Sequence, residues 1–189
     1  MAATDEQLAL QLQRGDQSAV DPLVERHYDP LLGYLYRMLD GDRPLAEDLV
    51  QETFLRVLRG ISGFDSSRRF KPWLYAIATN LARSHYTRAE TRRTITDDAP
   101  EHADVLDPPE AALLADDEAR AVSAALRTLP DHQRETLVLY YYGGLSLQAV
   151  ADTLGIPLGT VKSRLSNGVR RLRQHITELD READHEHYS

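Results

Sequence analysis

The segment at residues 144–173 constrains the fold more than any other part of this chain. Its first half begins after Ser146, a helix-capping residue, and repeats apolar side chains at helical spacing. It ends at Gly155, which can adopt the left-handed conformation that stops a helix. Pro157 then stands near the start of a second helix, where its missing N–H is tolerated. The apolar stripe of that second helix consists of Val161, Leu165, Val169 and Leu172. The pattern predicts a helix-turn-helix.

The outward side of the second helix is polar and basic, and it carries Lys162, Ser163, Ser166, Asn167, Arg170 and Arg173. Between Pro157 and His175 the chain has five Lys or Arg residues and no Asp or Glu. An ordinary helical hairpin with a solvated face is the alternative interpretation. Because a solvated face usually mixes both signs of charge, the single sign favours a helix that enters the major groove of DNA.

The charges of the chain are segregated, although the net charge of −8 taken alone argues against nucleic-acid binding. Residues 68–93 hold seven bases and one acid, and residues 119–175 hold eight bases and three acids. Residues 94–118 hold nine acids and no base. Two basic blocks around an acidic spacer predict two DNA-facing surfaces.

Apolar residues recur at intervals of three and four along most of the chain, which predicts an all-α protein. We expect helices at about residues 4–14, 17–39, 44–60, 70–90, 110–128, 131–142, 146–153 and 158–178. The stretch at 94–109 combines three prolines with acids and lacks periodicity. The sequence therefore predicts two small helical domains, residues 1–92 and 112–178. A flexible acidic linker at 93–111 joins them, and a disordered tail follows at 179–189.

Several classes of function lack any supporting residues. The chain has no cysteine, which excludes disulfides and Cys-ligated zinc. Its histidines have no metal-ligand spacing, and His185 and His187 lie in the polar tail. No nucleophile elbow or phosphate loop is present. We expect no catalytic residue, metal, cofactor or small-molecule substrate. The acidic start and the lack of a long apolar run predict a cytoplasmic protein without membrane insertion.

Two faces are expected on the helix at residues 44–60. The polar face holds Glu47, Asp48, Gln51, Glu52 and Leu55, and the buried face holds Val50, Phe54, Val57, Leu58 and Ile61. Acids and amides around one exposed leucine suit docking of a basic partner. A merely solvated face is equally compatible with the pattern.

A loop at residues 63–69 leads into a helix whose apolar stripe includes Trp73. A tryptophan can stack on a single-stranded base, but its place in the stripe favours core packing. Better candidates for contact with a nucleic-acid backbone are Arg83, Arg88, Arg92 and Arg93. Asn80 is a candidate reader of a base edge.

Taken together, these segments resemble a bacterial RNA polymerase sigma factor, of the extracytoplasmic-function (ECF) group within the sigma-70 family. The resemblance covers nearly the whole chain. Region 2.2 is similar to AEDLVQETFLRVLR, and regions 2.3 and 2.4 are similar to FDSSRRFKPWLYAIATNLAR. Region 4.1 is similar to LRTLPDHQRETLVLYYYGGLS, and region 4.2 is similar to LQAVADTLGIPLGTVKSRL. The order of these segments is more specific than the helix-turn-helix alone.

The resemblance implies a role for each group of residues. Glu47, Asp48, Gln51, Glu52 and Leu55 would dock on the clamp helices of the largest subunit of core RNA polymerase, and the flap would be a second contact. The minus-ten element would be bound and melted by Phe64, Asp65, Ser66, Ser67, Arg68, Arg69, Phe70, Lys71, Asn80 and Arg83. The minus-thirty-five element would be read by Thr160, Lys162, Ser163, Arg164, Ser166, Asn167, Arg170 and Arg171. An anti-sigma factor is a further implied partner.

The alternative is a transcriptional regulator that binds operator DNA through the same motif without being a polymerase subunit. Such a regulator would bind its operator in the absence of polymerase, whereas a sigma factor acts with core enzyme.

The chain departs from the family pattern at the second helix of the motif. Ser166, Asn167 and Gly168 stand where a bulky or basic residue followed by alanine is common. Short side chains reach less far into a groove, and glycine inside a helix costs about 1 kcal/mol relative to alanine. We expect weaker or altered minus-thirty-five readout, with more of the affinity in phosphate contacts.

Overall fold

All regular elements in the described part of the chain are helical, as predicted. The structure is a computed structural model that describes the backbone of residues 3–95 and 120–186 and the side chains of residues 3–88, 120–175 and 177. The first domain contains α1 (Asp5–Gln13), η1 (Gln17–Ala19), α2 (Val20–Met38), α3 (Arg43–Gly60), η2 (Ile61–Gly63) and α4 (Phe70–Ile95). The second domain contains a helical segment at 120–127, α6 (Asp131–Tyr141), α7 (Leu147–Leu154) and α8 (Leu158–Glu186).

The core of the first domain lies where α2, α3 and α4 pack together. Tyr34 of α2 and Tyr75 of α4 are fully buried, with ring centroids 5.1 Å apart in an edge-to-face contact. The Tyr34 hydroxyl and the Thr79 hydroxyl share a buried hydrogen bond of 2.8 Å. Trp73 is half-buried, and its ring centroid lies 4.8 Å from that of Phe64. The prediction that Trp73 packs in the core is confirmed.

The predicted helix-turn-helix is confirmed at α7 and α8. The Ser146 hydroxyl accepts a hydrogen bond from the backbone N–H of Ala149 and caps α7. Gly155 ends α7 with φ 65° and ψ 36°, the left-handed conformation that its sequence position predicted. Val150 of α7 and Val161 of α8 are both 0 % exposed and close the core between the two helices.

Two predicted boundaries are wrong. Helix α4 continues to Ile95 rather than stopping near residue 90, and α8 continues to Glu186 through most of the predicted disordered tail. The physical reason is that no glycine or proline follows Gly168, so residues with ordinary helix propensity extend α8 to its end. The remainder of the acidic linker and the last three residues, His187 among them, lie outside the described residues.

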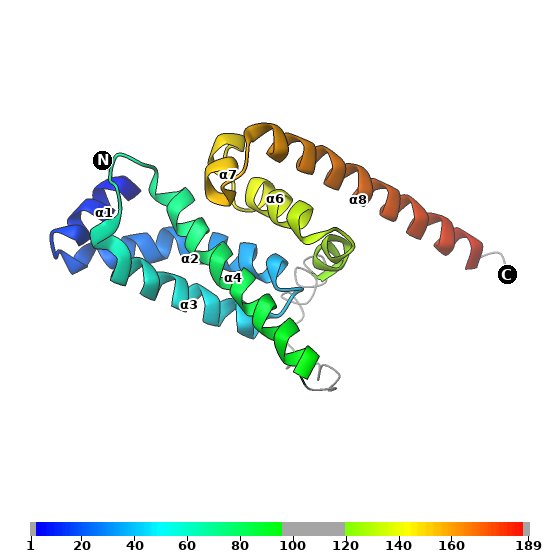
Figure 1. Cartoon of the computed structure of the whole chain (residues 1–189), viewed down its shortest axis with the longest axis horizontal. Helices are drawn as coiled ribbons and strands as arrows, with labels where there is room; N and C mark the ends of the chain where they lie inside the picture. The colour runs from blue at the N-terminus through cyan, green and yellow to red at the C-terminus, as the bar shows by residue number, and fades with distance from the viewer. Residues whose placement is uncertain (1–2, 96–119, 187–189) are drawn as a thin grey trace.

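The two domains contact each other, which no sequence pattern predicted. Helices α6 and α7 lie against α2 and α4, whereas the far part of α8 extends away from both domains (Figure 1). Arg83 of α4 donates through Nε and Nη2 to the two carboxylate oxygens of Glu135 on α6, both at 2.7 Å. Arg134 of α6 donates to Asp40 at 2.7 Å. Because Arg134 and Glu135 are each only 5 % exposed, these ion pairs are buried by the contact.

The packing of α8 on α6 explains why residue 168 is a glycine, which the sequence alone did not indicate. Gly168 is buried where α8 crosses α6, and a Cβ built there would lie 2.6 Å from Cδ1 of Leu137. Gly159, earlier in the same helix, has no atom within 4 Å of the equivalent position. The departure from alanine at residue 168 therefore allows close approach of the two helices.

We expect Gly168→Ala and Gly159→Ala to change stability in opposite directions. Gly159→Ala should stabilise the protein by up to about 1 kcal/mol, because alanine loses less entropy in a helix. Gly168→Ala should destabilise it by about 1 kcal/mol, since overpacking outweighs the gain in helix propensity. Urea denaturation of both variants measures the difference. Equal stabilisation by both would contradict the close packing of α8 on α6.

Candidate nucleic-acid interface

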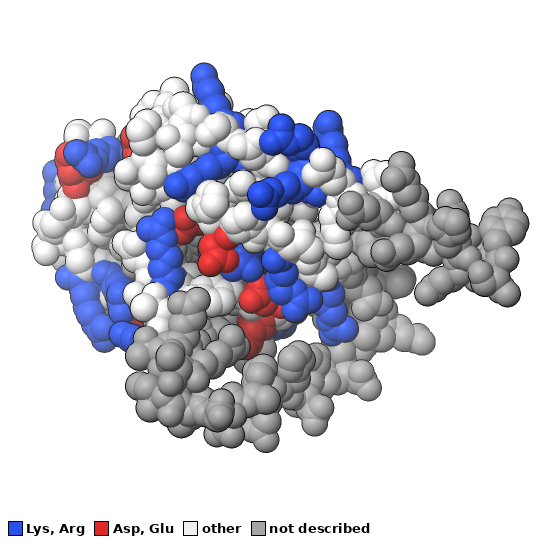
Figure 2. Space-filling model, turned by 45° about the vertical axis from the view of Figure 1, so that its right-hand side comes forward, with Lys and Arg blue, Asp and Glu red and all other residues white. Residues whose placement is uncertain are grey.

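All eight residues of α8 that were predicted to lie in the DNA groove reach the surface. Five are exposed: Lys162, Ser163, Ser166, Arg170 and Arg171. Three are half-buried: Thr160, Arg164 and Asn167. The Ser163 hydroxyl donates to the backbone carbonyl of Thr160 at 2.9 Å. Arg170 donates through Nη2 to Oδ1 of Asn167 at 2.7 Å. Cationic side chains gather on the upper part of the face shown in Figure 2, above a smaller group of acids. An anionic ligand would be attracted to this part of the surface.

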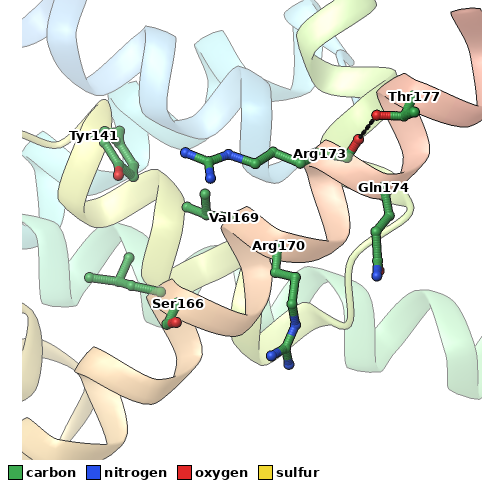
Figure 3. Close-up of a pocket in the computed structure, with 8 residues that line it drawn as sticks. Tyr141, Ser166, Val169, Arg170, Arg173, Gln174 and Thr177 are labelled. Carbon is green, nitrogen blue, oxygen red and sulfur yellow. Dashed lines mark hydrogen bonds between the residues drawn. The ribbon is translucent and has the colours of Figure 1, made fainter.

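A groove runs along one side of α8, beside the end of α6. It has a volume of about 670 Å³ and is lined by Tyr141, Leu165, Ser166, Val169, Arg170, Arg173, Gln174 and Thr177. Figure 3 shows the Arg173 side chain extending toward Tyr141, whereas Arg170 points to the opposite side of the helix. Tyr141 is 60 % exposed, so much of its ring is open to solvent at this groove. Ser166 and Arg170, both predicted to reach DNA, therefore also border a partly apolar groove.

The loop that precedes α4 has buried ends and an exposed tip. Phe64 is 5 % exposed and Phe70 is 0 % exposed, and their ring centroids lie 5.8 Å apart. The tip, residues 65–69, is exposed throughout. Oδ1 of Asp65 accepts from the backbone N–H of Ser67 at 3.0 Å and from its hydroxyl at 2.7 Å, and both bonds lower the pKa of Asp65. The role of Phe64 and Phe70 at the minus-ten element stays a prediction; both side chains pack into the core here, and the tip between them is the solvent-facing part of the loop.

Three further predicted minus-ten residues follow the loop on α4. Asn80 is exposed, as a reader of a base edge must be. The Arg83 guanidinium is held by Glu135, and this hydrogen bond raises the pKa of Arg83. Lys71 is half-buried, and its Nζ lies 5.9 Å from the centroid of the Tyr75 ring. Lys71 and Arg83 therefore have protein partners here, while Asn80 and the loop tip face solvent.

The polar face of α3 is exposed as predicted, but it is more apolar than the sequence indicated. Asp48 and Gln51 are exposed, and Leu55 is 46 % exposed. Leu58, predicted to be buried, is 39 % exposed and so joins this surface. Adjacent residues of a helix point about 100° apart, and on α3 the core side includes Val57, 2 % exposed, but not Leu58.

Two residues of the α3 face have intrahelical partners. Glu47 accepts from Arg43 at 3.0 Å, and Glu52 accepts from Arg56 at 2.8 Å. The bond from Arg56 lowers the pKa of Glu52. These ion pairs leave four residues of the face uncovered. We call them the α3 patch: Asp48, Gln51, Leu55 and Leu58.

No group of three or more His, Asp or Glu side chains that could hold a metal ion occurs among the described residues. Within the same ranges, no helix is both long and apolar enough to cross a membrane.

Family models match both domains. Residues 23–93 match Sigma-70 region 2, and residues 125–174 match Sigma-70 region 4. The chain belongs to the sigma-70 family. Its relatives place it in the ECF group, as the resemblance in the sequence indicated.

Two relatives and one solved structure cover almost the whole chain. The ECF RNA polymerase sigma factor SigW of Bacillus subtilis is 37 % identical over 89 % of this chain and 95 % of its own length. The RNA polymerase sigma-H factor of Pseudomonas aeruginosa is 32 % identical over 95 % of this chain and 97 % of its own length. The structure of CnrH in complex with the cytosolic domain of CnrY has a TM-score of 0.73 at 27 % identity, covering 92 % of this chain and 97 % of that one.

The protein is therefore a sigma factor, a subunit that directs RNA polymerase to promoters, and the operator-binding regulator is not favoured. Sigma factors of this family are regulatory polymerase subunits. Helix α1 lies outside the region 2 match, which begins at residue 23.

Proposed function

We propose that this sigma factor reads promoter DNA with two surfaces and docks on core polymerase with two others. The loop tip at 65–69, together with Asn80, binds and melts the minus-ten element. The N-terminal half of α8 binds the minus-thirty-five element. The observation that carries the proposal is the exposed, turn-stabilised loop tip between two buried aromatic anchors.

The loop tip has the chemistry that capture of an extruded base requires. Extruding a base costs a few kcal/mol, so the site must be formed in advance and must offset the phosphate charge. Ser66 offers a hydroxyl donor and acceptor, the Ser67 hydroxyl offers an acceptor, and Arg68 and Arg69 offer cations; all four residues are exposed. Phe64 and Phe70 support the tip from inside and do not stack on the base.

At the minus-thirty-five element, α8 makes mainly phosphate contacts. Arg164 and Arg171 lie on one flank of the helix and Lys162 lies on the other, so cations can approach both backbones of a groove. Asn167 is half-buried and already accepts a hydrogen bond from Arg170. This leaves few side chains free to read base edges, in keeping with the short residues at 166 and 167.

Asn167→Arg tests this weak readout. We expect about tenfold tighter promoter binding by the holoenzyme and a new base preference at one minus-thirty-five position, since a good base contact contributes about 1–3 kcal/mol. Ala121→Arg is the charge control, because it adds the same charge at an exposed position of the second domain outside α8 and its groove. Binding is measured on a promoter library. Unchanged affinity and preference in Asn167→Arg would contradict the proposal.

The α3 patch is proposed to dock on the clamp helices of the largest polymerase subunit. The groove beside α8 is proposed to seat a segment of the flap. Tyr141, Leu165 and Val169 give the groove an apolar floor, and Arg173 gives it a cationic edge. Such a groove suits an amphipathic helix with an acidic margin.

An anti-sigma factor is proposed to cover these docking surfaces until a signal arrives, in the cytoplasm where the polymerase acts. CnrH, the structural relative described above, was solved with the cytosolic domain of CnrY bound. Purification of this protein from cells under different stresses should recover either core polymerase or a second partner. Recovery of polymerase subunits alone under every condition would remove the support for an anti-sigma factor.

The central test of the proposed function is run-off transcription with purified core polymerase. Addition of this protein should yield transcripts from specific promoters, and the protein alone should bind duplex DNA weakly. Tight operator binding without polymerase, together with no effect on transcription by core enzyme, would overturn the proposal.

A further inference from the structure

We propose that α1 sets the shape of the minus-ten loop through two positioning residues, Gln13 and Glu6. The inference rests on the proposed role of residues 65–69 in base capture. It concerns the segment that lies outside the region 2 match, and it makes α1 a determinant of promoter specificity without DNA contact.

Gln13 holds the start of the loop. Its Nε2 donates to the backbone carbonyl of Ile61 at 2.9 Å and to that of Phe64 at 2.6 Å. A glutamine amide has two N–H donors, and both are used here on one stretch of backbone. The Phe64 carbonyl belongs to the peptide unit that leads directly into Asp65, the first residue of the exposed tip. Its direction fixes where the tip begins.

Glu6 holds the end of the loop. Its Oε1 accepts from the backbone N–H of Phe70 at 3.3 Å. Phe70 is the first residue of α4, and N–H groups of the first helical turn have no partner within their own helix. A carboxylate at this place is also favoured by the helix dipole. The two side chains of α1 therefore fix both ends of the six-residue step from Phe64 to Phe70.

Helix α1 is fixed within the first domain by capping, by an ion pair and by burial, so its side chains can position the loop. Thr4 and Gln7 form a reciprocal capping box at its start. Asp5 pairs with Arg26 and accepts from Nε2 of the buried His27 at 2.8 Å. Leu8, Ala9 and Leu12 are buried against the rest of the domain. Burial lowers the pKa of His27, which keeps this contact a hydrogen bond to a neutral ring near neutral pH.

The positions of Gln13 and Glu6 allow their bonds to the loop to be removed without unfolding the domain. Gln13 and Glu6 are half-buried at the margin of the core, whose fully buried members include Tyr34, Leu35 and Tyr75. Loss of the bonds should leave the bundle folded and the α3 patch unchanged, while the exposed tip samples more conformations. A looser tip discriminates less between bases, because pre-organisation of the site is lost.

The test uses Gln13→Met, which keeps the side-chain volume and removes both donors. Gln11→Met is the matched control, because Gln11 is exposed on the same helix. Each variant is assembled with core polymerase and assayed on two promoter libraries, one randomised at the minus-ten element and one at the minus-thirty-five element. We expect about tenfold weaker discrimination at one or two minus-ten positions in Gln13→Met, with minus-thirty-five preference and affinity for core polymerase unchanged. Gln11→Met should match the wild type.

Glu6→Gln and Glu6→Ala extend the test to the other end of the loop. Glu6→Gln keeps an acceptor for the Phe70 N–H and should retain most of the discrimination, whereas Glu6→Ala should lose it. The inference is overturned if Gln13→Met and Glu6→Ala discriminate as the wild type does, or if preference falls equally at both elements. Wild-type holoenzyme that shows no minus-ten preference at all would instead refute the proposed function of the loop.

Discussion

Leu55→Asp should abolish stable binding of this sigma factor to core RNA polymerase while leaving region 2 folded. Leu55 is 46 % exposed at the centre of the α3 patch, so the free protein loses little when it is replaced. In the complex, the substitution removes an apolar contact of about 1–2 kcal/mol. It also buries a carboxylate without a hydrogen-bonding or charged partner, which costs several kcal/mol more. A loss of affinity of at least about 100-fold is therefore expected.

The measurement is a fluorescence titration of labelled sigma factor with core enzyme, accompanied by thermal unfolding. Leu58→Asp should act in the same direction, because Leu58 belongs to the same patch. Ala124→Asp supplies the control: it places a negative charge on an exposed position of the second domain, outside the α3 patch. Wild-type affinity in Leu55→Asp would show that α3 does not dock on the polymerase.

Arg83→Ala should separate the two domains of the free protein. Glu135 is 5 % exposed, and both of its carboxylate oxygens accept hydrogen bonds from Arg83. Removal of one partner from a buried ion pair typically costs about 3–5 kcal/mol. Because the Arg83 side chain is 48 % exposed and water screens it, about 2 kcal/mol is the appropriate expectation. The ratio of closed to open molecules should fall about 30-fold.

Energy transfer between dyes on α3 and α8 reports this separation directly. Arg88→Ala removes an exposed arginine from the same helix and is the matched control. The double variant Arg83→Leu with Glu135→Leu should recover the closed arrangement, since no charge is then left buried. If Arg83→Ala kept the distance distribution of the wild type, the ion pair would not hold the domains together.

The interdomain pair also bears on promoter binding. The two hydrogen bonds to Glu135 use Nε and one Nη2 hydrogen of Arg83 and leave three of its five N–H donors for other contacts. In the closed arrangement Arg83, whose side chain is 48 % exposed, can therefore approach a phosphate only through its Nη1 and remaining Nη2 hydrogens.

Much of the candidate site could be predicted from local patterns. Ser146 and Gly155 placed the start and end of α7 because capping and left-handed backbone depend on the residue itself and its nearest neighbours. Trp73 was assigned to the core from its helical spacing. The same reasoning could not separate Val57 from Leu58, two adjacent apolar residues of which only one faces the core.

The sequence by itself determined the all-α class, the helix-turn-helix and the exposed loop tip, because each depends on interactions within a few residues. Only the tertiary structure decided that Phe64 and Phe70 turn inward, that Gly168 admits the crossing of α6 and α8, and that Arg83 pairs with Glu135. It also brought Gln13 to the start of the minus-ten loop, 51 residues away from Phe64 in the chain. Partners so distant leave no periodic or capping signal, since the contact exists only after the helices have packed.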